Sequence, residues 1–160
     1  MPPNPTRTHA EDKYLGVSVS DGEYAIPVVQ VKEIVGMLPV TRVPNVPGHV
    51  LGVVNLRGKV IPVVDLKQKL GVRAGEPSPQ PCLVVVTPTP GVQIGLVVDH
   101  VLEVGRIGAE DLDGNSGVTH PETGVVGLAK LHGRIRVLLD VATLLQEETS
   151  RAASSVANAA

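Results

Sequence analysis

Aromatic residues are almost missing from this sequence. Phe and Trp do not occur, and only two Tyr are present among 160 residues. Proteins that bind single-stranded nucleic acid stack its bases on aromatic side chains, and their binding surfaces are usually basic. The formal net charge here is −2. Neither feature is present, so we expect no nucleic-acid partner.

Cysteine and long apolar runs are also scarce. The lone cysteine, Cys82, excludes a disulfide within the chain, and the Leu-Val-Val-Val run after it favours a buried, small side chain. No apolar run has membrane-spanning length. Residues 1–13 are polar and Pro-rich, without the apolar core of a signal peptide. We therefore expect a cytoplasmic protein that does not insert into a membrane.

Patterns for catalysis are missing as well. The sequence has neither a Gly-x-Ser-x-Gly nucleophile motif nor a Gly-Lys-Ser/Thr phosphate-binding loop. It has five histidines, and these lack the spacing of metal ligands: His9, His49, His100, His120 and His132. We expect no enzyme activity, no cofactor and no metal.

One polar stretch imitates a calcium loop. Asp111, Asp113, Asn115 and Glu122 fall at positions 1, 3, 5 and 12 of the template. The position that is normally Gly holds Ser116, and a proline directly precedes the last acid. These departures favour a polar turn over a calcium site.

What the sequence does contain is β-branched residues, with 17 Gly and 14 Pro, which indicates short strands and many turns. Residues 52–70 show the pattern best. Two Val/Ile-rich runs flank Arg57-Gly58, which predicts a hairpin. Asp65 is placed to cap a short helix that Gly71 would end.

This unit occurs twice. Residues 127–145 repeat it 75 positions later, so that Gly133 matches Gly58 and Asp140 matches Asp65. Upstream, Val31–Ile34 matches Val101–Val104 at an offset of 70. Two matches in the same order indicate one supersecondary block used twice. The recurrence of the aspartate before each helical stretch favours helix capping as its role.

These motifs resemble the CheW-like domain of bacterial chemotaxis coupling proteins. The resemblance rests on Val-x-Glu-Ile at 31–34, Pro44-x-x-Pro47, the run at 52–66, Ile94–Asp99 and Leu138–Asp140. It extends over about residues 14–145. The resemblance implies an all-β fold of two tandem five-stranded SH3-like β-barrels, with short helical segments and a C-terminal helix.

We place the boundaries as follows. Residues 1–13 form a disordered tail, 14–80 a first barrel, 81–148 a second barrel, and 149–160 a flexible tail. The Pro-containing segment 73–81 is the expected linker.

The resemblance also implies a function. Proteins of this family are adaptors that link the cytoplasmic tips of methyl-accepting chemoreceptors to the regulatory domain of a CheA-type histidine kinase. An alternative is a stand-alone regulatory module that binds one signalling partner without bridging. The implied kinase contact uses apolar patches at the outer ends of the barrels, which the sequence does not assign to residues.

The resemblance implies that the receptor binds in the groove between the barrels, and the candidate contact residues there are Val31, Glu33, Gly52, Arg57, Gly58 and Val101. Arg57 matches His132 in the repeat, so the turn does not demand arginine, and an arginine that the fold does not need is free to anchor a partner. Glu33 recurs as Glu103, which leaves a binding role and a structural role open for this carboxylate.

Overall fold

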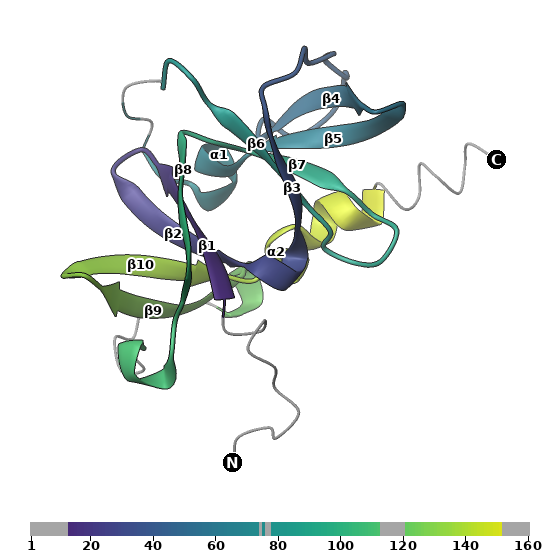
Figure 1. Ribbon diagram of the computed structural model, residues 1–160. Helices are drawn as coiled ribbons and strands as arrows, with labels where there is room; N and C mark the ends of the chain where they lie inside the picture. The colour runs from purple at the N-terminus through teal and green to yellow at the C-terminus, as the bar shows by residue number, and fades with distance from the viewer. Residues whose placement is uncertain (1–12, 74, 76–77, 113–120, 152–160) are drawn as a thin grey trace.

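The structure, a computed structural model, describes residues 13–73, 75, 78–112 and 121–151 and contains two five-stranded sheets (Figure 1). Barrel A has the strand order β8-β1-β2-β10-β9; its strands are β1 (Lys13–Val19), β2 (Gly22–Pro27), β8 (His100–Arg106), β9 (Val125–Leu131) and β10 (Arg134–Leu139). Barrel B has the order β3-β6-β7-β5-β4; its strands are β3 (Val31–Gly36), β4 (Val50–Leu56), β5 (Lys59–Asp65), β6 (Cys82–Val86) and β7 (Ile94–Val98).

The helices are short. They are α1 (Leu66–Leu70), α2 (Val141–Leu144) and the 3-10 turns η2 (Val28–Gln30), η3 (Ala109–Asp111) and η4 (Pro121–Thr123). Residues 146–151 are also helical and follow α2 after one turn residue. The all-β fold of two five-stranded barrels is confirmed. No helix in the described part of the chain is long and apolar enough to cross a membrane.

The barrels do not follow the predicted division of the chain at residue 80. β6 and β7 join β3, β4 and β5 in barrel B, whereas β1 and β2 join the three last strands in barrel A. Each half of the chain therefore gives its first hairpin to the other half. The predicted tails also differ at their inner edges, since Lys13 begins β1 and residues 149–151 are helical; the rest of both tails lies outside the described residues.

Short connections explain this exchange of hairpins. Only the three residues of η2 join β2 to β3, and only Asp99 joins β7 to β8. If β3 paired with β1 of its own half, the chain would have to return along β2, a distance of about 20 Å for six residues. Three residues span at most about 11 Å. The chain must therefore pass directly from one barrel into the other.

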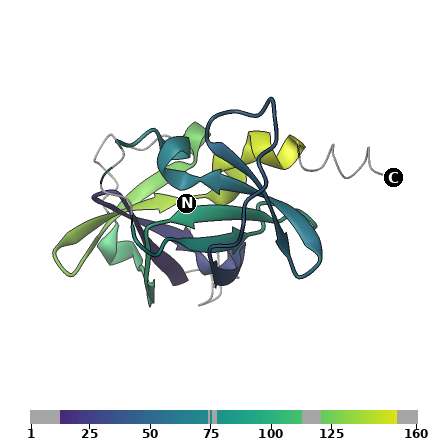
Figure 2. The ribbon, with the colours of Figure 1, turned by 90° about the horizontal axis from the view of Figure 1, so that it is seen from above.

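The sequence repeat is a repeat of structure. The hairpins β4–β5 and β9–β10 both turn through a non-glycine residue and then a glycine with positive φ: 52° at Arg57 and at His132, 86° at Gly58 and 76° at Gly133. β3 and β8 are the matching edge strands. Figures 1 and 2 show the two hairpins at opposite ends of the molecule.

The largest apolar core lies between the barrels. It combines buried residues of barrel A, including Leu15, Val17 and Ile26, with buried residues of barrel B, including Val84 and Leu96. A smaller cluster fills barrel B, and a third fills barrel A. Cys82 is partly buried against the shared core, so it is less enclosed than we expected. The largest part of the apolar core is therefore built from residues of both barrels.

The two connections also carry polar contacts between the barrels. The Gln30 side-chain amide donates to Asp140 Oδ1 at 2.7 Å, and its Oε1 accepts from the Val141 N–H at 3.0 Å. Asp99 Oδ2 accepts from the Ser20 N–H at 2.7 Å, while its Oδ1 lies 3.6 Å from Lys67 Nζ. Gln30 thus ties the first connection to the start of α2, and Asp99 ties the second to Ser20 after β1 and to Lys67 of α1.

The two helix caps differ, although the sequence predicts the same role for both aspartates. Asp65 Oδ1 accepts from the Lys67 N–H at 3.1 Å, and Gly71 ends α1 in the left-handed conformation, as predicted. The Asp140 side chain makes no such bond to α2 in the described chain. It binds Gln30 and the Thr143 hydroxyl, and Gln30 caps the helix instead. The capping role is therefore wrong for Asp140.

We expect Asp65→Ala to lower the free energy of unfolding by about 0.5–2 kcal/mol, the range for a lost N-cap. Asp140→Ala should cost at least as much, because it leaves Gln30 without its acceptor in a part-buried position. Gln30→Ala on the Asp140→Ala background should then cost less than in the wild type, because only the bond to the Val141 N–H is left to lose. Denaturant titrations of the three variants test this coupling, and fully additive losses would contradict it.

Candidate functional site

The turn between β4 and β5 presents Arg57 to solvent. Its side chain is 73% exposed. The turn is held by Asn55, whose Oδ1 accepts from the Gly58 N–H at 2.9 Å. Asn55 and the positive φ of Gly58 fix the backbone of the turn, so the turn conformation does not depend on the Arg57 side chain.

Arg57 forms an ion pair with Glu33 of β3. Its Nη1 donates to Glu33 Oε2 at 2.9 Å. Glu33 stands at a bulge in β3, and its side chain is only 18% exposed. Its other oxygen, Oε1, is buried and has no hydrogen-bond partner among the described residues. Three of the expected receptor residues, Glu33, Arg57 and Gly58, therefore lie together.

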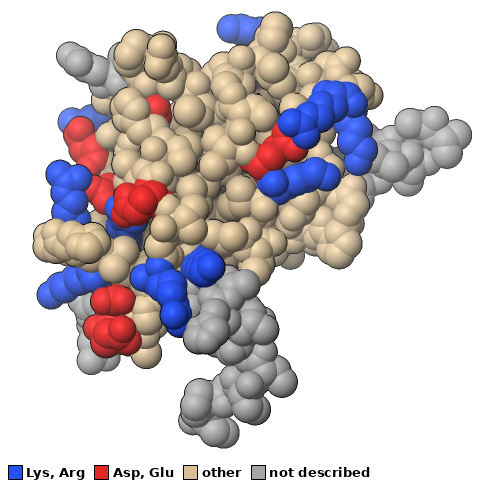
Figure 3. Space-filling view, in the orientation of Figure 1, with Lys and Arg blue, Asp and Glu red and all other residues tan. Residues whose placement is uncertain are grey.

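Val31 and Val101 occupy matching places on the two edge strands. Val31 pairs with Val86 and Val101 pairs with Val17, and each packs half-buried against the core between the barrels. In Figure 1, β3 and β8 both cross the face turned toward the viewer. Figure 3 shows charged side chains in groups on either side of this face, with a broad uncharged area between them.

The backbone geometry around position 52 requires a glycine there. Its φ is +146°, and a Cβ there would lie 2.1 Å from the Thr41 carbonyl oxygen. Thr41 and Val53 exchange backbone hydrogen bonds of 2.8 and 2.9 Å at this place. The glycine permits this close approach, so the fold alone requires it.

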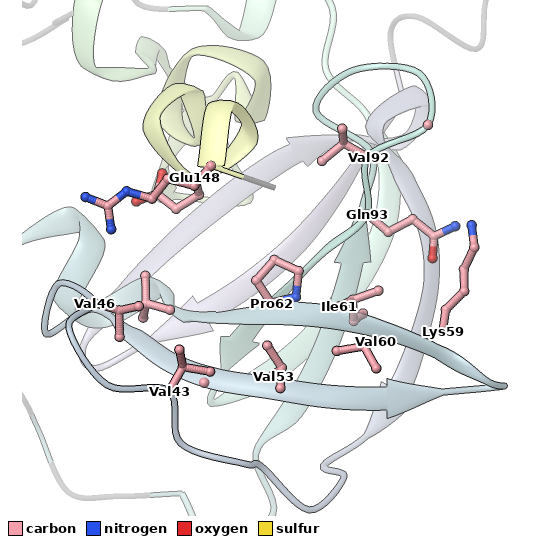
Figure 4. Close-up of a pocket in the computed structure, with 14 residues that line it drawn as sticks. Val43, Val46, Val53, Lys59, Val60, Ile61, Pro62, Val92, Gln93 and Glu148 are labelled. Atoms are coloured by element: carbon pink, nitrogen blue, oxygen red, sulfur yellow. The ribbon is translucent and has the colours of Figure 1, made fainter. Parts of the chain in front are cut away.

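An apolar groove of about 570 Å³ lies over the β4–β5 hairpin of barrel B (Figure 4). Its walls are the hairpin, the turn before β7 and the helical residues near the C-terminus. The labelled lining residues are Val43, Val46, Val53, Lys59, Val60, Ile61, Pro62, Val92, Gln93 and Glu148. Sequence reasoning missed this groove, although the outward alternation of Val60 and Pro62 on β5 could have indicated an exposed apolar face.

Glu148 fixes the last described helical residues to barrel B. Its Oε1 lies 2.5 Å from His49 Nε2 and 2.9 Å from Lys69 Nζ, and its side chain is 4% exposed. Burial opposes the charged carboxylate, but the hydrogen bonds from Lys69 and His49 outweigh it, so the pKa of Glu148 is lowered. This contact also shapes one wall of the groove.

We expect Glu148→Gln to lower the free energy of unfolding at pH 7 by about 1–3 kcal/mol, because it weakens the charge-assisted bonds of a buried carboxylate to His49 and Lys69. A carboxyl whose folded-state pKa is lowered stabilises the fold above its ordinary pKa and loses that contribution as the pH falls through the folded-state value. The wild-type advantage over Glu148→Gln should therefore shrink below about pH 4.5.

Chemical denaturation from pH 3 to pH 8 measures this difference. Glu147→Gln is the matched control, since Glu147 is the exposed neighbour on the same helical segment. A difference between wild type and Glu148→Gln that stays constant down to pH 3 would contradict the assigned role of the carboxylate.

Barrel A carries a different set of charges at the place that matches Glu33 and Arg57 of barrel B. Arg136 of β10 is 8% exposed; its Nε donates to Glu23 Oε1 at 2.9 Å and its Nη2 donates to Glu103 Oε1 at 2.6 Å. Arg134 also pairs with Glu23. The hydrogen bond from Arg136 lowers the pKa of Glu103, and that of Glu23 is lowered in the same way. Glu103 thus pairs with an arginine of its own barrel, while its side chain remains 57% exposed.

The calcium-like pattern gains no support. Asp113, Asn115 and Ser116 lie outside the described residues. Within the described ranges, no group of three or more His, Cys, Asp or Glu side chains is placed to hold a metal ion.

Comparison with known proteins agrees with this architecture. The family model of the CheW-like domain matches residues 13–149. The chain is 30% identical to chemotaxis protein CheW of Rhizobium meliloti (91% of this chain, 95% of the relative). It is 32% identical to chemotaxis protein CheW of Helicobacter pylori (85% and 82%). The crystal structure of the scaffolding protein TtCheW from Thermoanaerobacter tengcongensis superposes with a TM-score of 0.75 at 29% identity, covering 85% of this chain and 93% of that one. The chain therefore belongs to the CheW-like domain family.

Proposed function

We propose that this protein is a non-catalytic cytoplasmic adaptor that couples chemoreceptors to a CheA-type histidine kinase. Its relatives are named chemotaxis protein CheW, and the similar solved structure is described as a scaffolding protein. The observation that carries the proposal is mechanical. Two barrels share one core, and their matching hairpins project at opposite ends of a single body (Figures 1 and 2). Such a body can fix one partner relative to another.

The receptor site lies on β3 and the adjacent turn. Arg57 is the anchor, because its exposed guanidinium can bind a carboxylate of the receptor tip in a bidentate manner. Glu33 orients Arg57 through the ion pair at its Oε2. Val31 and Val101 supply apolar contact from the two edge strands. Gly58 permits the positive φ that the turn requires, and Gly52 permits the close approach of the Thr41 backbone.

The kinase sites lie on the outer faces of the two hairpins. Val60 of β5 is 68% exposed, and Ile135, its match in β10, is 58% exposed. A second matched pair, Ile34 and Val104, is exposed on the edge strands. The family's kinases carry a regulatory domain with the same paired-barrel fold, so a repeated apolar position suits a partner that is itself built from repeated barrels. In barrel B, Val60 joins the apolar groove, with Lys59 at its side.

The rival function is a regulatory module that holds one partner without bridging. It would need only one of these surfaces. The chain carries the exposed ion pair of Arg57 and Glu33 for the receptor and separate exposed apolar residues for the kinase. This favours the bridge, because a single-partner module has no use for both kinds of surface.

Size-exclusion chromatography with three components tests the proposal. The chain is mixed with a receptor-tip fragment and with a kinase regulatory domain, together and separately. A bridge gives one peak that contains all three proteins. Two binary complexes that never combine would instead support the single-partner module, and no binding to either protein would reject both functions.

A further inference from the structure

The apolar groove over the β4–β5 hairpin carries positive charge at its rim. Its lining residues include two cations, Lys59 and Arg151. Both residues are exposed, and within the described ranges neither forms an ion pair. The rest of the lining is mostly apolar and includes several valines. A partner that enters the groove therefore meets two uncompensated charges of the same sign.

Glu148 does not compensate these charges. It is the one acid among the described lining residues, and its side chain is only 4% exposed. Its Oε1 accepts from Lys69 Nζ at 2.9 Å and also contacts His49 Nε2. The negative charge of Glu148 is therefore already paired inside the fold, and the rim of the groove stays positive.

The two cations lie at different ends of the groove. Figure 4 shows Lys59 and Glu148 at opposite ends, with Ile61 and Pro62 between them. Arg151 follows Glu148 by three residues in the same helical segment, so it belongs to the Glu148 end. The apolar floor of the groove is thus flanked by a cation at each end.

We infer that this groove binds an apolar segment of the kinase regulatory domain that carries carboxylates at its edges, and that Lys59 and Arg151 select those carboxylates. The inference rests on the proposed kinase site at Val60 and adds the chemistry of the segment that occupies it. Apolar walls reduce the screening of the two cations, which strengthens their attraction for an acid that enters. Arg151 can bind a carboxylate through two parallel hydrogen bonds, whereas a basic segment would meet like charges at both ends.

Barrel A does not repeat this charge pattern. Its hairpin has the matching exposed apolar residue, Ile135, and the residue that matches Lys59 is Arg134. Arg134 forms an ion pair with Glu23, which also accepts from Arg136. The cations of this hairpin are therefore balanced by acids of the same barrel. We expect the preference for an acidic segment at the barrel B end and not at the barrel A end.

The salt dependence of kinase binding tests the inference. The chain carries Ile135→Asp throughout, which places a charge in the apolar contact of the barrel A hairpin and leaves the groove as the kinase site. Ile135 is 58% exposed, so the fold tolerates the change. Calorimetry gives the Kd of the kinase regulatory domain at about 50 and about 300 mM salt, and the affinity should fall at least about fivefold because salt screens exposed charges.

Lys59→Glu with Arg151→Glu should weaken binding at least about tenfold at the lower salt concentration and should abolish the loss with rising salt. The matched control is Lys13→Glu with Arg73→Glu, which changes the net charge equally at two exposed residues outside the groove lining. Its Kd should stay within about twofold of that of its parent. Melting curves establish that each variant is folded.

Val60→Ala separates the apolar contact from the ionic one. It should weaken binding by the same factor at both salt concentrations, because both cations remain. Loss of the salt dependence in this variant would contradict its assignment to Lys59 and Arg151.

Equal losses in the two double variants, or an unchanged Kd in Lys59→Glu with Arg151→Glu, would overturn the inference. A folded Ile135→Asp chain that no longer binds the kinase domain would overturn it as well, because the groove would then not be a kinase site. A wild-type chain that does not bind the kinase domain would instead reject the proposed kinase surfaces themselves.

Discussion

Arg57→Glu is expected to weaken receptor binding by at least about 2 kcal/mol, because it removes an anchor and adds charge repulsion in its place. The fold should survive. The side chain is 73% exposed, and an exposed ion pair contributes about 0–1 kcal/mol to stability. The new glutamate would also lie beside Glu33, so the turn loses attraction without losing its Asn55 support.

His132→Glu is the matched control for this prediction. It makes the same change at a turn of the same conformation, with φ of 52° at both residues. Receptor affinity should stay nearly unchanged, because His132 lies at the opposite end of the molecule from Arg57 and is no part of the proposed receptor site. Calorimetry against a receptor-tip fragment, with melting curves alongside, measures both variants. Equal losses at the two turns would remove Arg57 from the site, and an unfolded Arg57→Glu would assign it to the scaffold.

Cutting the chain between residues 77 and 81 should abolish independent folding of both pieces. The cut separates β6 and β7 from the other strands of barrel B, and it separates β1 and β2 from the other strands of barrel A. Each piece would expose the core that joins the barrels and would leave sheet edges unpaired. Neither piece alone should give a cooperative thermal transition.

Mixing the two pieces supplies the control. Each piece holds the hairpin that the other lacks, so an equimolar mixture should regain a cooperative transition whose midpoint rises with concentration. A cooperative transition in either piece alone would contradict the shared core. Failure of the mixture to fold, with both pieces intact and unaggregated, would contradict the exchange of hairpins.

Local features of this fold are readable from the sequence because they depend on neighbouring residues. The Arg57-Gly58 hairpin and the Asp65 cap follow from β-branched runs, a glycine and a short polar side chain within a few positions. The repeat of this unit was equally visible, since matched backbone conformations select matched residues such as Gly58 and Gly133.

Features that depend on contacts between segments far apart in the sequence could not be predicted from it. The order of strands within each barrel follows from connections that are too short to return, and no pattern in β1 or β6 names its partner. Asp140 looked like a cap because it repeats Asp65, yet Gln30 lies 110 positions earlier in the chain and takes that role. The ion pair of Glu103 likewise depends on Arg136 of β10, a strand that does not pair with β8.

Bridging is the central claim, and a sedimentation titration tests it directly. Vesicles that display receptor tips are spun with a fixed amount of kinase regulatory domain while the concentration of this chain is raised. A bridge with two separate binding faces predicts that kinase in the pellet rises, passes through a maximum and falls, because excess adaptor fills each partner separately. Kinase that stays in the supernatant at every concentration would contradict the account.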